Sequence, residues 1–278
     1  QYADDTTLTL YGFDSVRQCF NLINLYERAT GARINMLKTE GLLCGSLRHL
    51  DAGPPDIAIK WNNDKIKILG IWLGNNDTDR ENWSSKLDKF RATLSLWKHR
   101  DLSFRGKVCV INQLAASVLW YTASILVMPE WVKKQLEQDL WSFFWGHKSF
   151  LVDKQTCRLP VDRGGQGVVD FSVQSFALKT KWIKALLSDD LPIKWRPLAF
   201  HFIGQSNGIN LGKYCFLAPP KSNNRRVLMP FYEELFATWS LLQPSTRNQP
   251  LDWSIDQLLN VPLFDNPLIK CLKTGKML

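Results

Sequence analysis

The chain has 278 residues, of which 45% are hydrophobic and 22% are charged, and its formal net charge is +9. This composition excludes a disordered chain and is sufficient for one or two packed domains. The surplus of lysine and arginine favours an acidic partner, most often nucleic acid, although a merely well-solvated basic surface would have the same composition.

The cysteines and histidines show no spacing typical of a metal site. Free thiols are usual inside cells, so we expect an intracellular protein, nuclear or cytoplasmic, that is not secreted. Residues 108–128 carry no charge and are long enough to cross a bilayer. Polar residues such as Asn112 and Gln113 favour a buried helix instead, so no membrane partner is expected. The chain begins at Gln1 within a predicted strand, as a fragment would.

The first third of the sequence predicts short strands and one helix. Residues 1–13 predict a β-hairpin. Ser15 and Gln18 form a capping-box pattern at the start of a helix, and Gly31 stands where that helix should end. The remaining predicted strands are residues 32–44, 57–61 and 65–73.

From residue 83 onward the pattern is helical. Four apolar residues form one stripe of the first helix, namely Leu87, Phe90, Leu94 and Trp97. A second helix over 105–128 is apolar on most sides, and a third begins at Pro129 and ends at Gly146. Three consecutive helices predict a small bundle. Beyond it, 176–187 is a predicted helix and 219–225 a predicted linker.

Asp4 and Asp5 are the residues most suggestive of chemistry. Two adjacent carboxylates at a tight hairpin are costly to bury without a cation. Carboxylate oxygens suit Mg²⁺, and two-metal phosphoryl transfer uses such ligands. Asp-Asp is also common in an ordinary solvated turn, so the dipeptide by itself leaves both interpretations open.

The surrounding sequence resembles a known family. Tyr2-Ala3-Asp4-Asp5 is similar to the catalytic C motif of reverse transcriptases, and the later segments resemble the LINE-type (non-LTR) retrotransposon branch. GARINMLKTE at 31–40 is similar to its D motif, and KILGIWLG at 67–74 to its E motif, the primer grip. The segment 86–114 resembles the family's thumb, and RLPVDRGGQGVVDF at 158–171 resembles the segment that follows the thumb. VPLFDNPLI at 261–269 resembles a short motif late in such proteins.

The resemblance implies roles for individual residues. Asp4 and Asp5 match the metal-binding carboxylates, and Lys38 matches a lysine that gives a proton to departing pyrophosphate. Gly70 matches the primer-grip glycine, which allows the backbone to approach a primer phosphate. Lys38 is equally compatible with an ordinary exposed lysine, and Gly70 with a plain strand bulge.

The thumb-like segment is strongly basic. Residues 80–110 hold eight basic and three acidic residues, a net charge of +5. Such a surplus is typical of phosphate-backbone contact without base reading, although a solvated helix face is the alternative. The residues expected to bind nucleic acid are Gly70, Lys86, Lys89, Arg91, Lys98, Arg100, Arg105 and Lys107.

We therefore expect an α+β fold in three parts. Residues 1–76 should form the C-terminal part of a polymerase palm, 77–148 a helical thumb, and 149–278 a mostly helical post-thumb region. The family reaction is Mg²⁺-dependent RNA-directed DNA polymerisation on an RNA template and a DNA primer. Because the family's third aspartate and its fingers precede the C motif, this chain should bind Mg²⁺ weakly or not at all and be inactive without the upstream palm and fingers. The alternative is a non-enzymatic nucleic-acid-binding remnant of a decayed element.

Overall fold

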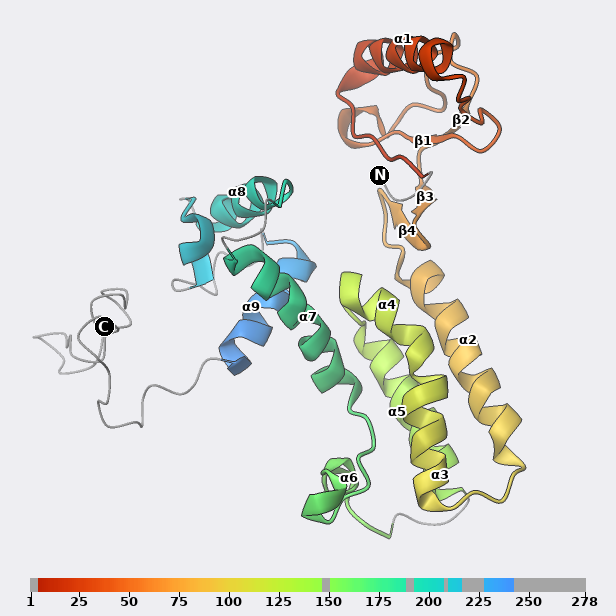
Figure 1. Ribbon diagram of the computed structural model, residues 1–278, viewed down its shortest axis with the longest axis vertical. Helices are drawn as coiled ribbons and strands as arrows, with labels where there is room; N and C mark the ends of the chain where they lie inside the picture. The colour runs from red at the N-terminus through yellow and green to blue at the C-terminus, as the bar shows by residue number, and fades with distance from the viewer. Residues whose placement is uncertain (1–4, 147–150, 189–192, 208–209, 217–227, 243–278) are drawn as a thin grey trace, which may run out of the picture. The chain divides into compact units, whose positions relative to one another are not determined.

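A computed structural model describes residues 5–146, 151–188, 193–207, 210–216 and 228–242 (Figure 1). The chain divides into two compact units, residues 1–92 and 93–278, and the division falls within one long helix. The described residues form helices and two small two-stranded sheets, so the expected α+β class is confirmed. The division into palm, thumb and post-thumb regions remains a prediction.

The first unit opens with an irregular segment and helix α1 (Gly12–Thr30). The predicted hairpin over 1–13 is wrong in its described part, because residues 6–10 form no strand and Asp5 makes only an isolated bridge. Helix α1 begins three residues before the predicted capping box, so Ser15 lies inside the helix and caps nothing. Gly31 does end the helix, with φ +76° and its N–H donated to the Glu27 carbonyl at 2.8 Å.

Two pairs of short strands follow. β1 (Glu40–Leu42) is parallel to β2 (Lys60–Asn62), and β3 (Lys65–Ile68) is antiparallel to β4 (Ile71–Gly74). The predicted single strand over 65–73 is wrong, because the chain reverses at Leu69 and Gly70. Both have positive φ, 47° and 83°, as the two central residues of a type I′ hairpin turn require.

Helix α2 (Asp79–Lys98) carries the expected apolar stripe. Leu87, Phe90 and Leu94 are buried, and Trp97 is half-buried. Trp83, one turn before Leu87, is completely buried as well. The stripe thus extends over most of the helix, as its 3.6-residue period predicts.

The predicted helix over 105–128 is not one continuous α-helix. Helix α3 (Phe104–Cys109) passes into a π-helical segment, η2 (Val110–Ala115), and then into α4 (Ser117–Ile125) with a bend of 46°. The Asn112 side chain explains why the irregular turn is tolerated, because it donates to the Gly167 carbonyl at 2.8 Å and accepts from the Val169 N–H at 3.1 Å. The π-helical segment is therefore held by hydrogen bonds to a loop more than fifty residues away in the sequence.

Helix α5 (Glu130–Trp145) begins and ends where the sequence predicts, at Pro129 and Gly146. The elements described after α5 are helical, as expected. They are α6 (Lys154–Arg158), η3 (Val161–Arg163), α7 (Phe171–Leu187), α8 (Arg196–Asn207), η4 (Gly212–Phe216) and α9 (Pro230–Leu242). In the first unit, the short helix η1 (Gly45–Leu47) follows β1. Helix α7 packs with α8 and α9 around a core that includes Ile183, Ile203 and Leu235.

Among the described residues, no single helix has the length and apolar character needed to cross a membrane. The bent pair formed by 104–115 and Ser117–Ile125 would meet that requirement only by its combined length and composition. The predicted linker at 219–225 and the motif at 261–269 lie outside the described residues.

Candidate nucleic-acid interface

The predicted metal site is described only in part. Asp4 lies outside the described residues, and Asp5 is exposed just before α1. Lys38 is exposed in the turn before β1, where its backbone N–H is donated to Asn35. Within the described ranges, no three His, Cys, Asp or Glu side chains lie together as a metal site would require. The roles of Asp4, Asp5 and Lys38 remain predictions.

Gly70 occupies the tip of the β3–β4 hairpin. Its φ of +83° follows the +47° of Leu69, so the turn depends on glycine at the second position. Leu69 is 46% exposed, and Gly70 is exposed beside it. The primer-grip glycine that the resemblance suggested therefore lies at an accessible two-residue turn rather than at a strand bulge.

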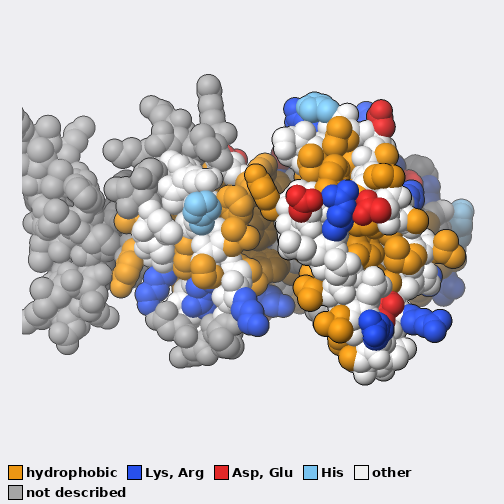
Figure 2. Space-filling view, turned by 90° about the horizontal axis from the view of Figure 1, so that it is seen from above, with side chains coloured by type: hydrophobic (Ala, Val, Ile, Leu, Met, Phe, Trp, Pro, Cys, Tyr) orange, Lys and Arg blue, Asp and Glu red, His pale blue; other side chains and the backbone are white. Residues whose placement is uncertain are grey.

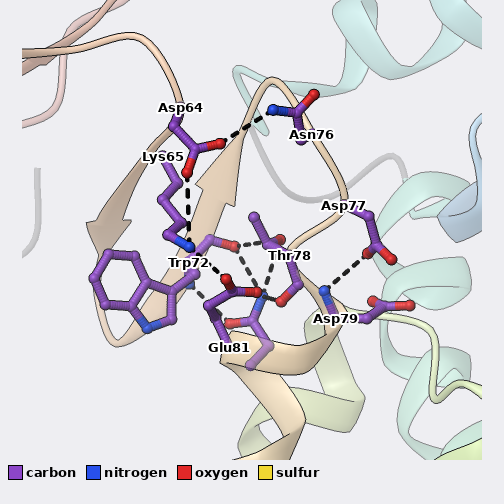
Figure 3. Close-up of polar contacts among 9 residues, drawn as sticks. Asp64, Lys65, Trp72, Asn76, Asp77, Thr78, Asp79 and Glu81 are labelled. Carbon is purple, nitrogen blue, oxygen red and sulfur yellow. Dashed lines mark hydrogen bonds and ion pairs between the residues drawn. The ribbon is translucent and has the colours of Figure 1, made fainter.

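The hairpin is joined rigidly to the start of α2 (Figure 3). The buried Asn82 amide accepts a hydrogen bond from the Trp72 N–H at 2.8 Å and donates to the Trp72 carbonyl at 2.9 Å. Thr78 donates its hydroxyl to the same carbonyl at 3.0 Å. Lys65 forms ion pairs with Glu81 and, at 3.6 Å, with Asp64.

These contacts satisfy the hydrogen-bonding groups of the Trp72 backbone in β4, as a neighbouring strand would. Asn82 was not among the predicted site residues. At about 100° per residue it falls on the edge of α2 that carries Lys86 and Lys89, outside the apolar stripe, so the helical pattern did not mark it as buried. Because the hairpin cannot pivot freely on α2, its tip keeps a defined position relative to the helix surface.

Three lysines gather where the hairpin meets the helix. Lys67 is paired across the hairpin with Trp72, and its ammonium lies 5.6 Å from the Trp72 ring centre. Burial lowers the pKa of the Lys86 ammonium, and repulsion from Lys89 and Lys67 lowers it further. An anion bound here would relieve this repulsion, so the three side chains suit a phosphate group. Lys67 was not among the residues predicted from the sequence.

The basic residues of α2 lie on two sides of the helix and do not form a single positive face. At about 100° per residue, Lys86 and Lys89 lie on one side of the buried stripe, while Arg91 and Lys98 lie on the other. On the face of the molecule shown in Figure 2, lysine and arginine side chains occur in several separate groups. Helix α2 thus has two basic edges, and the edge beside the hairpin includes the lysine whose pKa is lowered.

The remaining predicted residues lie in the second unit. Arg100 and Arg105 are exposed, and the Arg100 guanidinium lies 4.3 Å from the Trp97 ring centre. Lys107 is half-buried and donates to the Phe144 carbonyl at 3.0 Å, in the last turn of α5. This bond places Lys107 at a helix C-terminus, where a cation is stabilising in its own right.

A surface pocket of about 530 Å³ lies elsewhere in the first unit. It is lined by α1 and by the segments after it, with Arg17, Glu27, Arg33 and Asp56 among its residues. Two of these charges pair with each other, since Arg17 bonds Asp56 at 2.9 Å. Of the predicted site residues that the structure describes, none is among those that line the pocket.

No protein-family model matches the chain. The chain is similar to the "Transposon TX1 uncharacterized 149 kDa protein" of Xenopus laevis, with 32% identity over 275 residues. The match includes 97% of this chain but 21% of that protein, so the chain spans about a fifth of its relative. The similarity supports an origin of this chain in a non-LTR retrotransposon, as the sequence resemblance implied.

Proposed function

We propose that the chain is part of an RNA-directed DNA polymerase of a non-LTR retrotransposon and contributes contacts to the primer–template duplex. The family reaction is Mg²⁺-dependent nucleotidyl transfer to a primer 3′ end, with Asp4 and Asp5 as metal ligands. Lys38 would protonate the departing pyrophosphate. The resemblance, the transposon-encoded relative and the hairpin–helix geometry support this proposal.

The observation that carries the proposal is the group of lysines where the hairpin meets α2. Lys67, Lys86 and Lys89 come from two elements that Asn82 holds together. Burial lowers the pKa of Lys86, and repulsion from Lys89 and Lys67 adds to this shift. Ammonium groups that repel one another gain most from a bound polyanion. The exposed turn at Leu69 and Gly70 would let the protein backbone approach a phosphate of the same nucleic-acid strand.

Duplex binding tests the proposal. Fluorescence anisotropy of a labelled DNA primer on an RNA template should show an affinity that falls steeply with salt and depends little on sequence. The double variant Lys86→Gln/Lys89→Gln should bind more weakly and have a shallower salt dependence, by about 0.9 in the logarithmic slope for each phosphate that the protein no longer neutralises.

The other edge of α2 provides a matched comparison. The variant Arg91→Gln/Lys98→Gln removes the same charge from the same helix, and we expect it to reduce affinity less. Equal reductions would contradict the assignment of the interface to the hairpin edge. Affinity that does not change with salt would contradict backbone contact altogether.

A further inference from the structure

The end of α2, the start of α3 and the connection between them carry aromatic and cationic side chains in the second unit. The Arg100 guanidinium lies over the Trp97 ring at 4.3 Å, close enough for a cation–π contact. Arg100 is exposed and Trp97 is half-buried. The ring therefore serves as a support for a planar cation at the surface, which reduces the flexibility that an arginine side chain would otherwise have.

Phe104, the first residue of α3, is 45% exposed although it is firmly held. Its ring centre lies 5.2 Å from that of Phe144 and 5.6 Å from that of Trp145. Ser103 caps the helix by accepting from the Gly106 N–H at 3.2 Å, which fixes the backbone beside the ring. Phe104 is thus an ordered aromatic ring with nearly half of its surface in water.

Lys107 contributes to this arrangement from below the surface. Its ammonium lies 5.7 Å from the Phe104 ring centre and is bonded to the Phe144 carbonyl. This bond links α3 to the end of α5 and holds Phe104 against its aromatic neighbours. Lys107 is therefore a positioning residue in this segment, whereas Lys98 and Arg105 are exposed cations on either side of Phe104 in the sequence.

We infer that residues 97–107 form a stacking platform for unpaired bases of a nucleic-acid strand. Phe104 and the guanidinium held over Trp97 offer flat surfaces on which bases stack, while Lys98 and Arg105 contact the phosphates. Platforms of this kind combine aromatic rings with cations and tolerate any base, because every base has a π face. The inference rests on the proposed function and adds a preference for single-stranded nucleotides at one place.

Ordinary surface exposure is the competing explanation for Phe104, since single apolar residues are common at protein surfaces. Leu96 provides the comparison, because it is 68% exposed and lies one residue before Trp97. A leucine cannot stack on a base as a ring does. Replacing Leu96 should therefore leave strand binding unchanged, whereas replacing Phe104 should not.

The experiment measures binding of the full 278-residue chain to a dT12 strand, an rU12 strand, a blunt duplex and heparin. Phe104→Leu should weaken binding to both single strands by about fivefold or more, the lower end of what loss of one stacked base costs. Binding to the duplex and to heparin should change by less than about twofold, because neither ligand offers an unpaired base. Leu96→Ala should change none of the four affinities.

Photochemical cross-linking gives a second readout that a purely structural role would not produce. A strand containing 5-iodouracil should cross-link to Phe104 or Trp97, identified by mass spectrometry of the peptides. Equal weakening of all four ligands by Phe104→Leu, or cross-links only elsewhere, would overturn the platform but not the proposal that the chain binds a primer–template duplex. Absence of binding to every nucleic acid would overturn both the platform and the proposed function.

Discussion

The side chain of Asn82 pairs with both backbone groups of Trp72, accepting from its N–H at 2.8 Å and donating to its carbonyl at 2.9 Å. Asn82 also donates to the Thr78 carbonyl at 3.0 Å and is only 3% exposed. One amide therefore closes the edge of β4 and ties the hairpin to α2. Replacing it would leave the Trp72 N–H without this acceptor, whereas the Trp72 carbonyl would keep the hydrogen bond from the Thr78 hydroxyl.

Asn82→Ala is expected to lower the free energy of unfolding by about 2 kcal/mol, because the bonds it removes are buried. It should also speed hydrogen exchange at the Trp72 amide, measured by mass spectrometry. Asn76→Ala is the control, since Asn76 is exposed and bonds the Asp64 side chain, at 3.1 Å. Unchanged exchange at Trp72 in the Asn82 variant would show that these bonds do not hold the hairpin.

Leu69 occupies a backbone conformation that suits asparagine better than leucine, with φ +47°. Leu69→Asn would create the Asn-Gly pair preferred in such turns and should raise the free energy of unfolding by about 1 kcal/mol. Duplex binding should weaken nevertheless, because the exposed leucine is removed from the hairpin tip. A variant that is more stable and binds equally well would argue against a role of Leu69 in the interface.

Lys179 is completely buried and connects three helices. Its ammonium donates to the carbonyls of Ala123 at 2.7 Å and Leu126 at 2.9 Å, at the end of α4, and lies 3.2 Å from the Glu234 carboxylate of α9. Burial lowers the pKa of Lys179, and Glu234 opposes that shift. The cation replaces the hydrogen bonds that the last turn of α4 lacks.

Lys179→Met should therefore destabilise the second unit by about 3 kcal/mol, since it leaves Glu234 as an uncompensated buried charge. Urea denaturation measures the change. Lys181→Met, in the same helix at an exposed position, should be nearly neutral. If Lys179→Met were as stable as the natural sequence, the buried ion pair would contribute nothing to holding α4, α7 and α9 together.

Cys215 is expected to make the free energy of unfolding depend on pH in the alkaline range. Burial raises the pKa of its thiol from 9.0 to about 12, with backbone hydrogen bonds acting in the opposite direction. Between these values the unfolded chain loses the proton while the folded chain keeps it, so stability should fall as pH rises above 9. Cys215→Ala should flatten this part of the curve. The exposed Cys109→Ala serves as control and should leave the curve unchanged.

A polypeptide of these 278 residues should not extend a primer in the presence of Mg²⁺ and nucleotides. Two-metal transfer needs two ions held about 4 Å apart by carboxylates on rigid elements, and neighbours such as Asp4 and Asp5 supply only part of such a cage. Supplying the upstream palm and fingers as a second polypeptide should restore synthesis. Extension by the chain alone that disappears in Asp4→Ala would prove this expectation wrong.

Local sequence patterns were sufficient for several features of the fold. Gly31, Pro129 and Gly146 mark helix ends because their backbone preferences act on adjacent residues. The stripe of α2 follows from apolar spacing alone. Two predictions were wrong because local patterns do not report where an element starts or turns. The capping pattern at Ser15 lies inside a helix, and the strand pattern over 65–73 continues through a turn.

Only the tertiary structure determined how the candidate interface is assembled. The partnership of Asn82 with Trp72, the grouping of Lys67 with Lys86, and the bond from Lys107 to Phe144 join residues from different elements. Periodicity cannot predict such contacts, because they depend on which surfaces meet after folding. The sequence by itself determined which residues carry charge and where several of the helices end. The tertiary structure decided which of those charges gather at the hairpin, because only folding brings a strand's lysine beside a helix's lysines.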